Sequence, residues 1–264
     1  MINAVTCALI ILGGIGYIVW WDLRRVFKDV RTQGTGCFKR LTLHSKIVLS
    51  SSVVLILVGG ALIFAFEFSN PLTIGNMSLF DKLQVSLFQS VTTRTAGFAS
   101  VPQENLTNGS AFVSLLLMFI GGSPVGTAGG IKTVTFVVLA VTAYTVIKGR
   151  NEVTLFNRSI PLQATRKAVA VMMTSFAIMV ISTVSLAAVT DASALDIIYE
   201  TVSATATVGL TRNLTPFLNS VGKMIVICTM YLGRIGPISL AIAFTYHKEI
   251  VNNIKNPTEE ISVG

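Results

Sequence analysis

Long apolar stretches alternate with polar segments along this chain of 264 residues. A helix needs about 20 consecutive apolar residues to cross the hydrocarbon core of a bilayer. Five stretches approach or exceed that length, and three of them contain no charged side chain. They cover residues 4–21, 47–66, 111–147, 168–189 and 221–246. Because lipid cannot satisfy free backbone polar groups, the pattern predicts membrane-spanning helices.

The composition supports this prediction. Hydrophobic residues make up 52% of the chain and charged residues 12%, with a mean hydropathy of +0.72. Ordinary globular domains contain about 25% charged residues. A soluble core cannot bury that apolar excess, which argues against a soluble enzyme and against a protein that binds nucleic acid. Cys7, Cys37 and Cys228 show no CxxC spacing, and two histidines cannot build a histidine metal site.

The basic residues are distributed unevenly between the apolar stretches. Residues 24–46 contain seven lysines and arginines and residues 148–167 contain five, whereas the connections 67–109 and 190–220 together contain three. Loops rich in Lys and Arg lie on the cytoplasmic side of a membrane. We therefore predict that both basic loops and the tail 247–264 are cytoplasmic, so that successive spans alternate in direction.

The two connections that are poor in basic residues have the character of re-entrant loops. Each contains a short amphipathic stretch, residues 79–91 and 194–202, followed by a segment rich in Thr, Ala and Gly. Non-helical backbone at membrane depth is tolerated only where it is buried in protein or lines water. The two segments also resemble each other, with Gly97 and Gly209 in corresponding places 112 positions apart. The chain is therefore predicted to contain two complete units, each built from a span, a pore loop and a second span.

A third trace of the pattern lies near the N-terminus. Residues 10–16 resemble residues 118–122 and 230–236, which lie in the second spans of the two units. We interpret this trace as the end of a preceding unit, and we expect the natural chain to start further upstream. The predicted fold class is an all-α integral membrane protein of potassium-channel-like architecture. The expected segments are the end of the preceding unit (1–23), a cytoplasmic basic loop (24–46), a pore unit (47–147), a second basic loop (148–167), a second pore unit (168–246) and a cytoplasmic tail (247–264).

The glycine-containing segments of the two loops are candidate ion-binding sites. One of them, residues 207–210, is close to the TVGYG sequence of potassium channels, in which backbone carbonyls replace the hydration shell of the ion. Glycine permits backbone conformations that let successive carbonyls point the same way, and a Thr hydroxyl offers one further oxygen. The predicted filter residues are Thr95, Ala96, Gly97, Phe98, Thr207, Val208, Gly209 and Leu210. The alternative is a pair of glycine turns between helices.

The apolar stretch 111–147 is interrupted by residues 121–130, which are rich in glycine and include Pro124. Each Gly costs about 1 kcal/mol and Pro about 3 kcal/mol relative to Ala in a helix. We therefore expect irregular backbone that lines a cavity. A close helix-packing patch is the alternative, because small residues let helices approach each other.

Charged residues near these segments give further expectations. Arg234 lies within an apolar stretch, where a charge is costly and usually faces water or a partner. We expect it to face a cavity below residues 207–210 and to act as a barrier to cations; snorkelling or a structural ion pair is the alternative. Arg94 is expected to point away from the pore, towards Glu200 or another extracellular acid. Asp81 and Asp196 would stabilise the N-terminal ends of the pore helices.

These motifs resemble those of the Trk/Ktr/HKT superfamily of potassium transporters, and specifically the Ktr/Trk membrane subunit. The resemblance rests on residues 93–98, on residues 118–133 and on residues 207–210. It implies four span–loop–span units around one pore, of which this chain matches the third, the fourth and the end of the second. The N-terminal half of the pore would therefore be missing from this chain.

The resemblance also implies further properties of the assembly. It implies an intramembrane gate loop below the filter, a homodimer with a pore in each protomer, and a cytosolic ring of nucleotide-binding regulatory subunits. The gate would include Gly121, Gly122, Ser123, Pro124, Gly126, Gly129, Gly130, Lys132 and Arg234. The protein would be a multi-pass protein of the cell membrane without a cofactor, with K⁺ as the transported ion and Na⁺ as a second candidate.

The sequence therefore predicts potassium uptake driven by the membrane potential, which contributes about 2.3 kcal/mol per unit charge for each 100 mV. An intramembrane enzyme is not expected, because it would need a nucleophile with a base or a metal site, and no histidine and no pair of acids lies within a confident span. Two alternatives stay open. An ion-coupled secondary transporter with broken helices would have inverted repeats and acids within its spans. A non-conducting remnant would keep the family sequence without activity.

Overall fold

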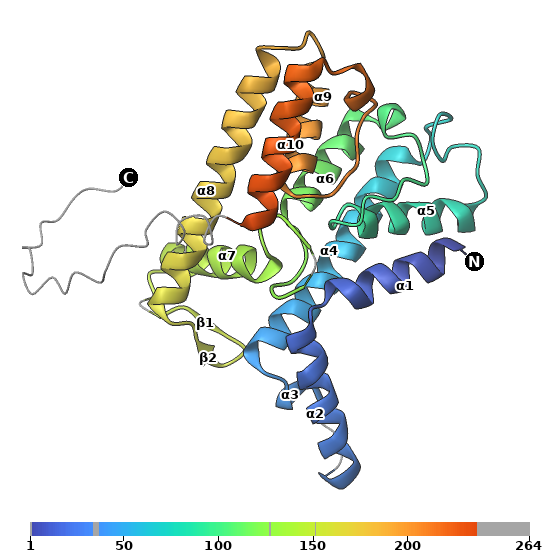
Figure 1. The fold of residues 1–264 in the computed structure, drawn as a ribbon. Coiled ribbons are helices and arrows are strands. Elements are labelled where there is room, and N and C mark those ends of the chain that lie inside the picture. Colours follow the sequence, from blue (N-terminus) through green and yellow to red (C-terminus); the bar gives the residue numbers. More distant parts are fainter. Residues whose placement is uncertain (1, 34–36, 127, 151, 237–264) are drawn as a thin grey trace, which may run out of the picture.

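The computed structural model describes residues 2–33, 37–126, 128–150 and 152–236 (Figure 1). Nearly all of the regular structure in these residues is helical. The α-helices are α1 (Ile2–Gly14), α2 (Tyr17–Gln33), α3 (Cys37–Arg40), α4 (Leu43–Glu67), α5 (Leu79–Thr92), α6 (Asn108–Phe119), α7 (Thr133–Ile147), α8 (Leu162–Ala187), α9 (Ala194–Thr205) and α10 (Ser220–Ile235). Two 3₁₀ turns, η1 (Gln103–Asn105) and η2 (Thr215–Phe217), and two short strands, β1 (Thr154–Leu155) and β2 (Arg158–Ser159), complete the set.

Two of the described helices, α4 and α8, are each long and apolar enough to cross a membrane, and a third span is possible if α1 and the first part of α2 form one bent span. Most of the residues of α8 are exposed in the isolated chain, as expected for a helix that contacts lipid. The chain is therefore a mostly helical membrane protein. Residues 237–246 of the last apolar stretch and the tail 247–264 lie outside the described residues.

The predicted interruption of the apolar stretch 111–147 is confirmed. Helix α6 ends at Phe119 and α7 begins only at Thr133, with irregular backbone between them. The apolar run near the N-terminus differs from the expectation of one continuous span. It bends by 91° between α1 and α2, where Gly16 adopts a φ of 85°. Helix α2 then continues through part of the segment that was expected to be a basic loop.

Helices α5 and α9 begin with matching N-terminal caps. The Ser78 hydroxyl accepts a hydrogen bond from the Asp81 backbone N–H at 3.2 Å and donates to the Asp81 carboxylate at 2.7 Å. Ser193 and Asp196 repeat both distances at the start of α9. A Ser followed three residues later by an acid is a sequence signature of a helix start. Both acids thus lie in the first helical turn, as expected.

The helices form two groups that pack against each other. We call α4, α5 and α6 the first helix group, and α8, α9 and α10 the second helix group. Within each group the shorter helix α5 or α9 packs against the long helix, and α6 packs against α9 to join the groups (Figure 1). The joint is an apolar cluster that includes Met118 from α6 and Tyr199 from α9, both with no exposed surface.

A small hairpin connects the two groups below α7. Strands β1 and β2 pair antiparallel, with Thr154 opposite Ser159. The turn residues Phe156 and Asn157 both have positive φ, at 50° and 60°. That geometry is typical of a two-residue hairpin turn. The sequence analysis predicted no strands here, because it classified residues 148–167 by their charge.

Candidate functional site

The two glycine segments leave the C-terminal ends of α5 and α9 with the same pattern of backbone conformations. Thr95 and Gly97 have φ values of 67° and 77°, and Thr207 and Gly209 have values of 52° and 96°. A threonine with positive φ is strained, because its side chain crowds the backbone. In each segment one residue with ordinary φ separates the two with positive φ. The two segments thus share the same pattern of backbone strain at corresponding places.

A hydroxyl group six residues upstream supports each segment. Thr92 Oγ1 accepts a hydrogen bond from the Phe98 backbone N–H at 2.7 Å and donates one to the Phe98 carbonyl at the same distance. Ser203 Oγ accepts from the Gly209 backbone N–H at 3.2 Å. Helices α5 and α9 thus each hold the glycine segment that follows them.

The two segments contact each other directly. A Cβ atom on Gly97 would clash with the carbonyl oxygen of Val208, so only glycine fits at position 97. Gly209 has open space at the corresponding position. The outermost residues also differ, because Phe98 is 56% exposed whereas Leu210 is 3% exposed. The structure therefore brings residues 95–98 and 207–210 together, although their environments are not identical.

The irregular backbone between α6 and α7 satisfies its polar groups by pairing its own two ends. The Gly121 N–H donates to the Ile131 carbonyl at 2.8 Å, and the Ile131 N–H donates to the Phe119 carbonyl at 3.3 Å. The Thr133 N–H donates to the Gly122 carbonyl at 3.1 Å. A loop that bonds to itself in this way can persist at membrane depth without helical hydrogen bonds.

This loop lies directly against the second glycine segment. A Cβ atom on Gly129 would overlap with Thr207 Oγ1 and would lie 2.5 Å from the Ala206 carbonyl oxygen. A Cβ atom on Gly130 would lie 3.2 Å from Ala206 Cβ. Lys132, at the end of the loop, donates from Nζ to the Ala128 carbonyl. Gly129 is therefore required by the close approach of the loop to residues 206 and 207.

The opposite side of the loop contacts the bend between α1 and α2. The Ser123 N–H donates to the Gly14 carbonyl at 3.2 Å, and the Ser123 hydroxyl donates to the Ile15 carbonyl. A Cβ atom on Gly16 would lie 2.7 Å from the Pro124 carbonyl oxygen, and one on Gly126 would lie 3.6 Å from Gly16 Cα. The N-terminal glycine motif and the interrupted span therefore form one packed region.

Arg234 lies in the last turn of α10, between the glycine segment and the loop. It lines a cavity of about 320 Å³ together with Thr207, Val208 and Gly209. It also lines a second cavity of about 410 Å³, which includes Pro124, Gly129, Gly130 and Lys132 among its lining residues. Part of the predicted gate and the second predicted filter segment thus line two separate cavities, which share Arg234.

Arg94 has a different partner from the expected one. Its Nη2 donates to Ser52 Oγ of α4 at 3.2 Å, and its Nε has no hydrogen-bond partner among the described residues. Glu200 instead accepts hydrogen bonds from the hydroxyls of Thr211 at 2.6 Å and Thr215 at 2.5 Å. The expectation that Arg94 points towards Glu200 is wrong. The hydroxyls of Thr211 and Thr215 already bind the Glu200 carboxylate, and Arg94 lies beside α4.

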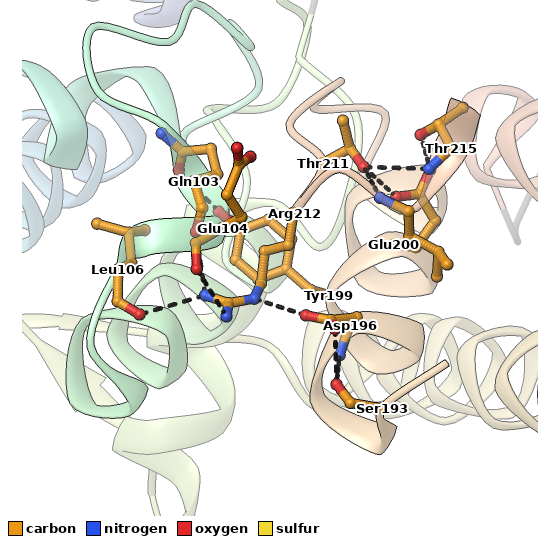
Figure 2. Close-up of polar contacts among 11 residues, drawn as sticks. Gln103, Glu104, Leu106, Ser193, Asp196, Tyr199, Glu200, Thr211, Arg212 and Thr215 are labelled. Atoms are coloured by element: carbon orange, nitrogen blue, oxygen red, sulfur yellow. Dashed lines mark hydrogen bonds and ion pairs between the residues drawn. The ribbon is translucent and has the colours of Figure 1, made fainter. Parts of the chain in front are cut away.

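The sequence analysis missed the residues that connect the two helix groups outside the glycine segments. Arg212, three residues after Gly209, forms an ion pair with Asp196 at 2.7 Å (Figure 2). It also donates to the carbonyls of Gln103 at 3.0 Å, Glu104 at 3.2 Å and Leu106 at 3.4 Å. Partial burial raises the pKa of the Asp196 carboxyl, but hydrogen bonds from Ser193 and Arg212 and the Arg212 charge outweigh it and hold that pKa below its usual range.

Gln103 is the second missed residue. Its side-chain oxygen accepts from Gln89 Nε2 at 2.6 Å and from the Tyr199 hydroxyl at 3.0 Å. Gln89 belongs to α5 and Tyr199 to α9, so one side chain contacts both pore helices. The sequence indicated Asp196 only as an acid near the start of a predicted helix, and nothing local in the sequence pairs Gln103 or Arg212 with partners about 100 positions away.

The fold and the site together define a class: a helical membrane protein with glycine segments and an intramembrane loop around shared cavities, as in cation transporters. A family model described as "Cation transport protein", TrkH, matches residues 1–253. The chain therefore belongs to the TrkH family, which is a family of transporters and not of enzymes.

Similar proteins support the same assignment. The chain is 40% identical over 263 residues to the Ktr system potassium uptake protein B of Bacillus subtilis, covering 100% of this chain and 57% of that protein. It is 33% identical to the potassium/sodium uptake protein NtpJ of Enterococcus hirae, covering 98% of this chain and 56% of that protein. The structure of the potassium transporter TrkH from Vibrio parahaemolyticus matches with a TM-score of 0.71 at 17% identity, covering 93% of this chain and 52% of that one. The chain thus spans about half the length of the relatives it matches.

Proposed function

We propose that the chain forms half of a carbonyl-lined pathway for the uptake of potassium across the cell membrane. The proposal is supported above all by the contact between Gly97 and the Val208 carbonyl, which brings two strained glycine segments side by side. Residues 95–98 and 207–210 are the filter segments of this pathway. Their backbone oxygens replace the water around a desolvated monovalent cation.

The helix groups are, in this proposal, two span–pore loop–span units, and α1 with α2 is the end of a preceding unit. A complete pathway has four such units, so two filter segments come from outside this chain. The basic segments 24–46 and 148–167 face the cytoplasm. The protein acts as a homodimer, with a cytosolic ring of nucleotide-binding subunits as regulator. The name of the Bacillus relative supports a role within a Ktr system.

Residues 121–132 form the gate in this proposal, and Arg234 is the electrostatic barrier below the filter. Support comes from the cavities that Arg234 shares with both segments. Potassium is the preferred ion, and the name of the Enterococcus relative favours sodium as a second transported ion.

The filter assignment is tested by Gly209→Ser in a complete pore that contains this chain. The serine side chain and the positive φ at this position disturb carbonyl orientation, so the K⁺/Na⁺ permeability ratio should fall. Gly149→Ser is the matched control, because Gly149 also has positive φ and open space but lies in a loop beyond α7. An unchanged permeability ratio for Gly209→Ser would reject the filter assignment.

The barrier role is tested by Arg234→Ala in the same pore. Removal of the positive charge should raise cation flux, because a charge at low dielectric repels a passing cation strongly. Lys223→Ala is the control, since Lys223 lies near the other end of the same helix. Reduced or unaltered flux in the Arg234 variant would rule out a barrier at this residue.

A further inference from the structure

The two helix groups are joined by a polar network on the side of the glycine segments away from the loop 121–132. It has two layers that share Gln103. In one layer the Arg212 guanidinium reaches from the second group to three carbonyls of the first group. In the other layer the Gln103 side chain contacts Gln89 of α5 and Tyr199 of α9. We call these five residues, Gln89, Gln103, Asp196, Tyr199 and Arg212, the inter-group clamp.

Each member of the clamp is held in place by further contacts. Asp196 is fixed by the Ser193 cap, so the carboxylate that pairs with Arg212 cannot swing freely. The Arg212 side chain is 11% exposed, and its guanidinium donates to the Asp196 carboxylate and to three backbone carbonyls (Figure 2). The planar guanidinium of an arginine can donate hydrogen bonds in several fixed directions at once, which the ammonium group of a lysine cannot do.

The inner layer is buried more deeply. Tyr199 has no exposed surface, Gln89 is 1% exposed and Gln103 is 3% exposed. Gln103 Nε2 donates to the backbone carbonyl of Val101, two residues earlier in the chain, at 2.8 Å and to Gln89 Oε1 at 3.3 Å. Buried polar groups with every partner in place define one arrangement of the surrounding helices, because any shift leaves a donor or acceptor unsatisfied.

The clamp is directly continuous with the glycine segments. Arg212 follows the segment 207–210, and Gln103 lies shortly after the segment 95–98. Between them the Gly97 backbone touches the Val208 carbonyl. A relative displacement of the two groups therefore changes the spacing of the very oxygens that would surround an ion.

We propose that the inter-group clamp sets the spacing of the two filter segments and thereby contributes to the choice between potassium and sodium. Its members are positioning residues, because they act through the backbone at 95–98 and 207–210. This inference rests on the proposed function of those segments as a filter.

The test compares Arg212→Gln with Asp81→Asn in a complete pore that contains this chain. Asp81 has the same capping role at the start of α5, but the described residues include no ion pair for it. We expect Arg212→Gln to lower the K⁺/Na⁺ permeability ratio by about tenfold, equivalent to about 1.4 kcal/mol, and Asp81→Asn to leave the ratio unchanged. Arg212→Lys should give an intermediate permeability ratio, because lysine keeps the positive charge but lacks the planar guanidinium.

A second measurement separates this inference from the proposed function. Amide hydrogen exchange of the chain in lipid nanodiscs reports the mobility of residues 95–98 and 207–210 without any need for conduction. Arg212→Gln should speed exchange in both segments, including the one in the other helix group. Tyr199→Phe, which keeps the shape and removes one hydroxyl, should do so to a smaller degree and serves if Arg212→Gln does not fold.

The outcomes are distinct. An unchanged permeability ratio in a conducting Arg212→Gln pore overturns the inference, even if the variant is less stable. If the unaltered pore does not conduct, the proposed function fails and amide hydrogen exchange alone tests the clamp. Faster exchange of residues 95–98 in Arg212→Gln then supports positioning by the clamp, and unaltered exchange overturns it.

Discussion

The two helix groups share the supports of their glycine segments and differ in what lies beneath them. Each pore helix begins with a Ser-Asp cap and holds its segment with a hydroxyl six residues upstream. In the first group the following helix α6 stops at Phe119 and gives way to an irregular loop. In the second group α10 continues without a break to Ile235 and places Arg234 below its segment.

This difference indicates a division of tasks. The first group supplies the loop that packs against Thr207 of the second group, and the second group supplies the charge beside that loop. Neither feature would complete the proposed gate alone. Similar local sequences have thus acquired unequal roles through their contacts with each other.

Substitution of the two central glycines should reveal the largest difference between the groups. Gly97→Ala combines a positive φ with a clash against the Val208 carbonyl, and should cost about 2–6 kcal/mol in the free energy of unfolding. Gly209→Ala meets open space and pays only the backbone strain, about 1–3 kcal/mol. Thermal unfolding of the purified variants measures both, and equal losses would contradict the asymmetric contact.

Two glycines of the loop provide the next comparison. Gly129→Ala should disturb the segment at Thr207 and cost about 1–3 kcal/mol, because the added Cβ has no room. Gly126→Ala is the control, since its Cβ would make only ordinary contacts of 3.5 Å or more. Unfolding temperature and cation flux should both change for position 129 only; a similar response at position 126 would argue against direct packing of the loop on the filter segment.

Two buried glutamates, Glu67 and Glu200, differ in the type of group that donates hydrogen bonds to their carboxylates. Glu67 accepts from the Thr107 backbone N–H at 2.8 Å and from Asn70 Nδ2 at 2.7 Å, one on each carboxylate oxygen. In Glu67→Gln the new NH₂ group therefore faces a group that can only donate. The Glu200 carboxylate instead accepts from the hydroxyls of Thr211 and Thr215, which can rotate and accept a hydrogen bond in turn.

Glu67→Gln should accordingly destabilise the protein by about 1–3 kcal/mol, and Glu200→Gln by less. Denaturation in detergent at constant lipid content measures the difference. A larger loss for the Glu200 variant would show that the carboxylate charge, rather than the match of donors and acceptors, dominates at these sites.

The hydroxyl supports should show the smallest difference. Thr92→Val removes the group that contacts both the N–H and the carbonyl of Phe98, and should cost about 1–2 kcal/mol. Ser203→Ala removes one longer bond to the Gly209 N–H and should cost less. Amide exchange at Phe98 and Gly209 is the direct measurement, and equal protection in both variants and the unaltered chain would dismiss the hydroxyls as supports.

Local sequence patterns were sufficient for the elements that depend on nearby residues. The amphipathic stretches located α5 and α9, and the glycine-rich run located the break between α6 and α7. The bend at Gly16 was missed, because an apolar run does not reveal where a helix changes direction. The partner of Arg94 was misassigned, since a sequence does not show that α4 lies closer to it than Glu200.

The sequence by itself determined a membrane protein, its apolar stretches, its cation-transport family and the two glycine segments, because hydrophobicity, charge and glycine spacing act over short distances. Only the tertiary structure decided that Gly97 meets Val208, that the loop reaches Thr207, and that Arg212 and Gln103 join the two groups. Those contacts link residues about 80 to 110 positions apart. Their formation depends on how entire helices pack, and no local pattern specifies that packing.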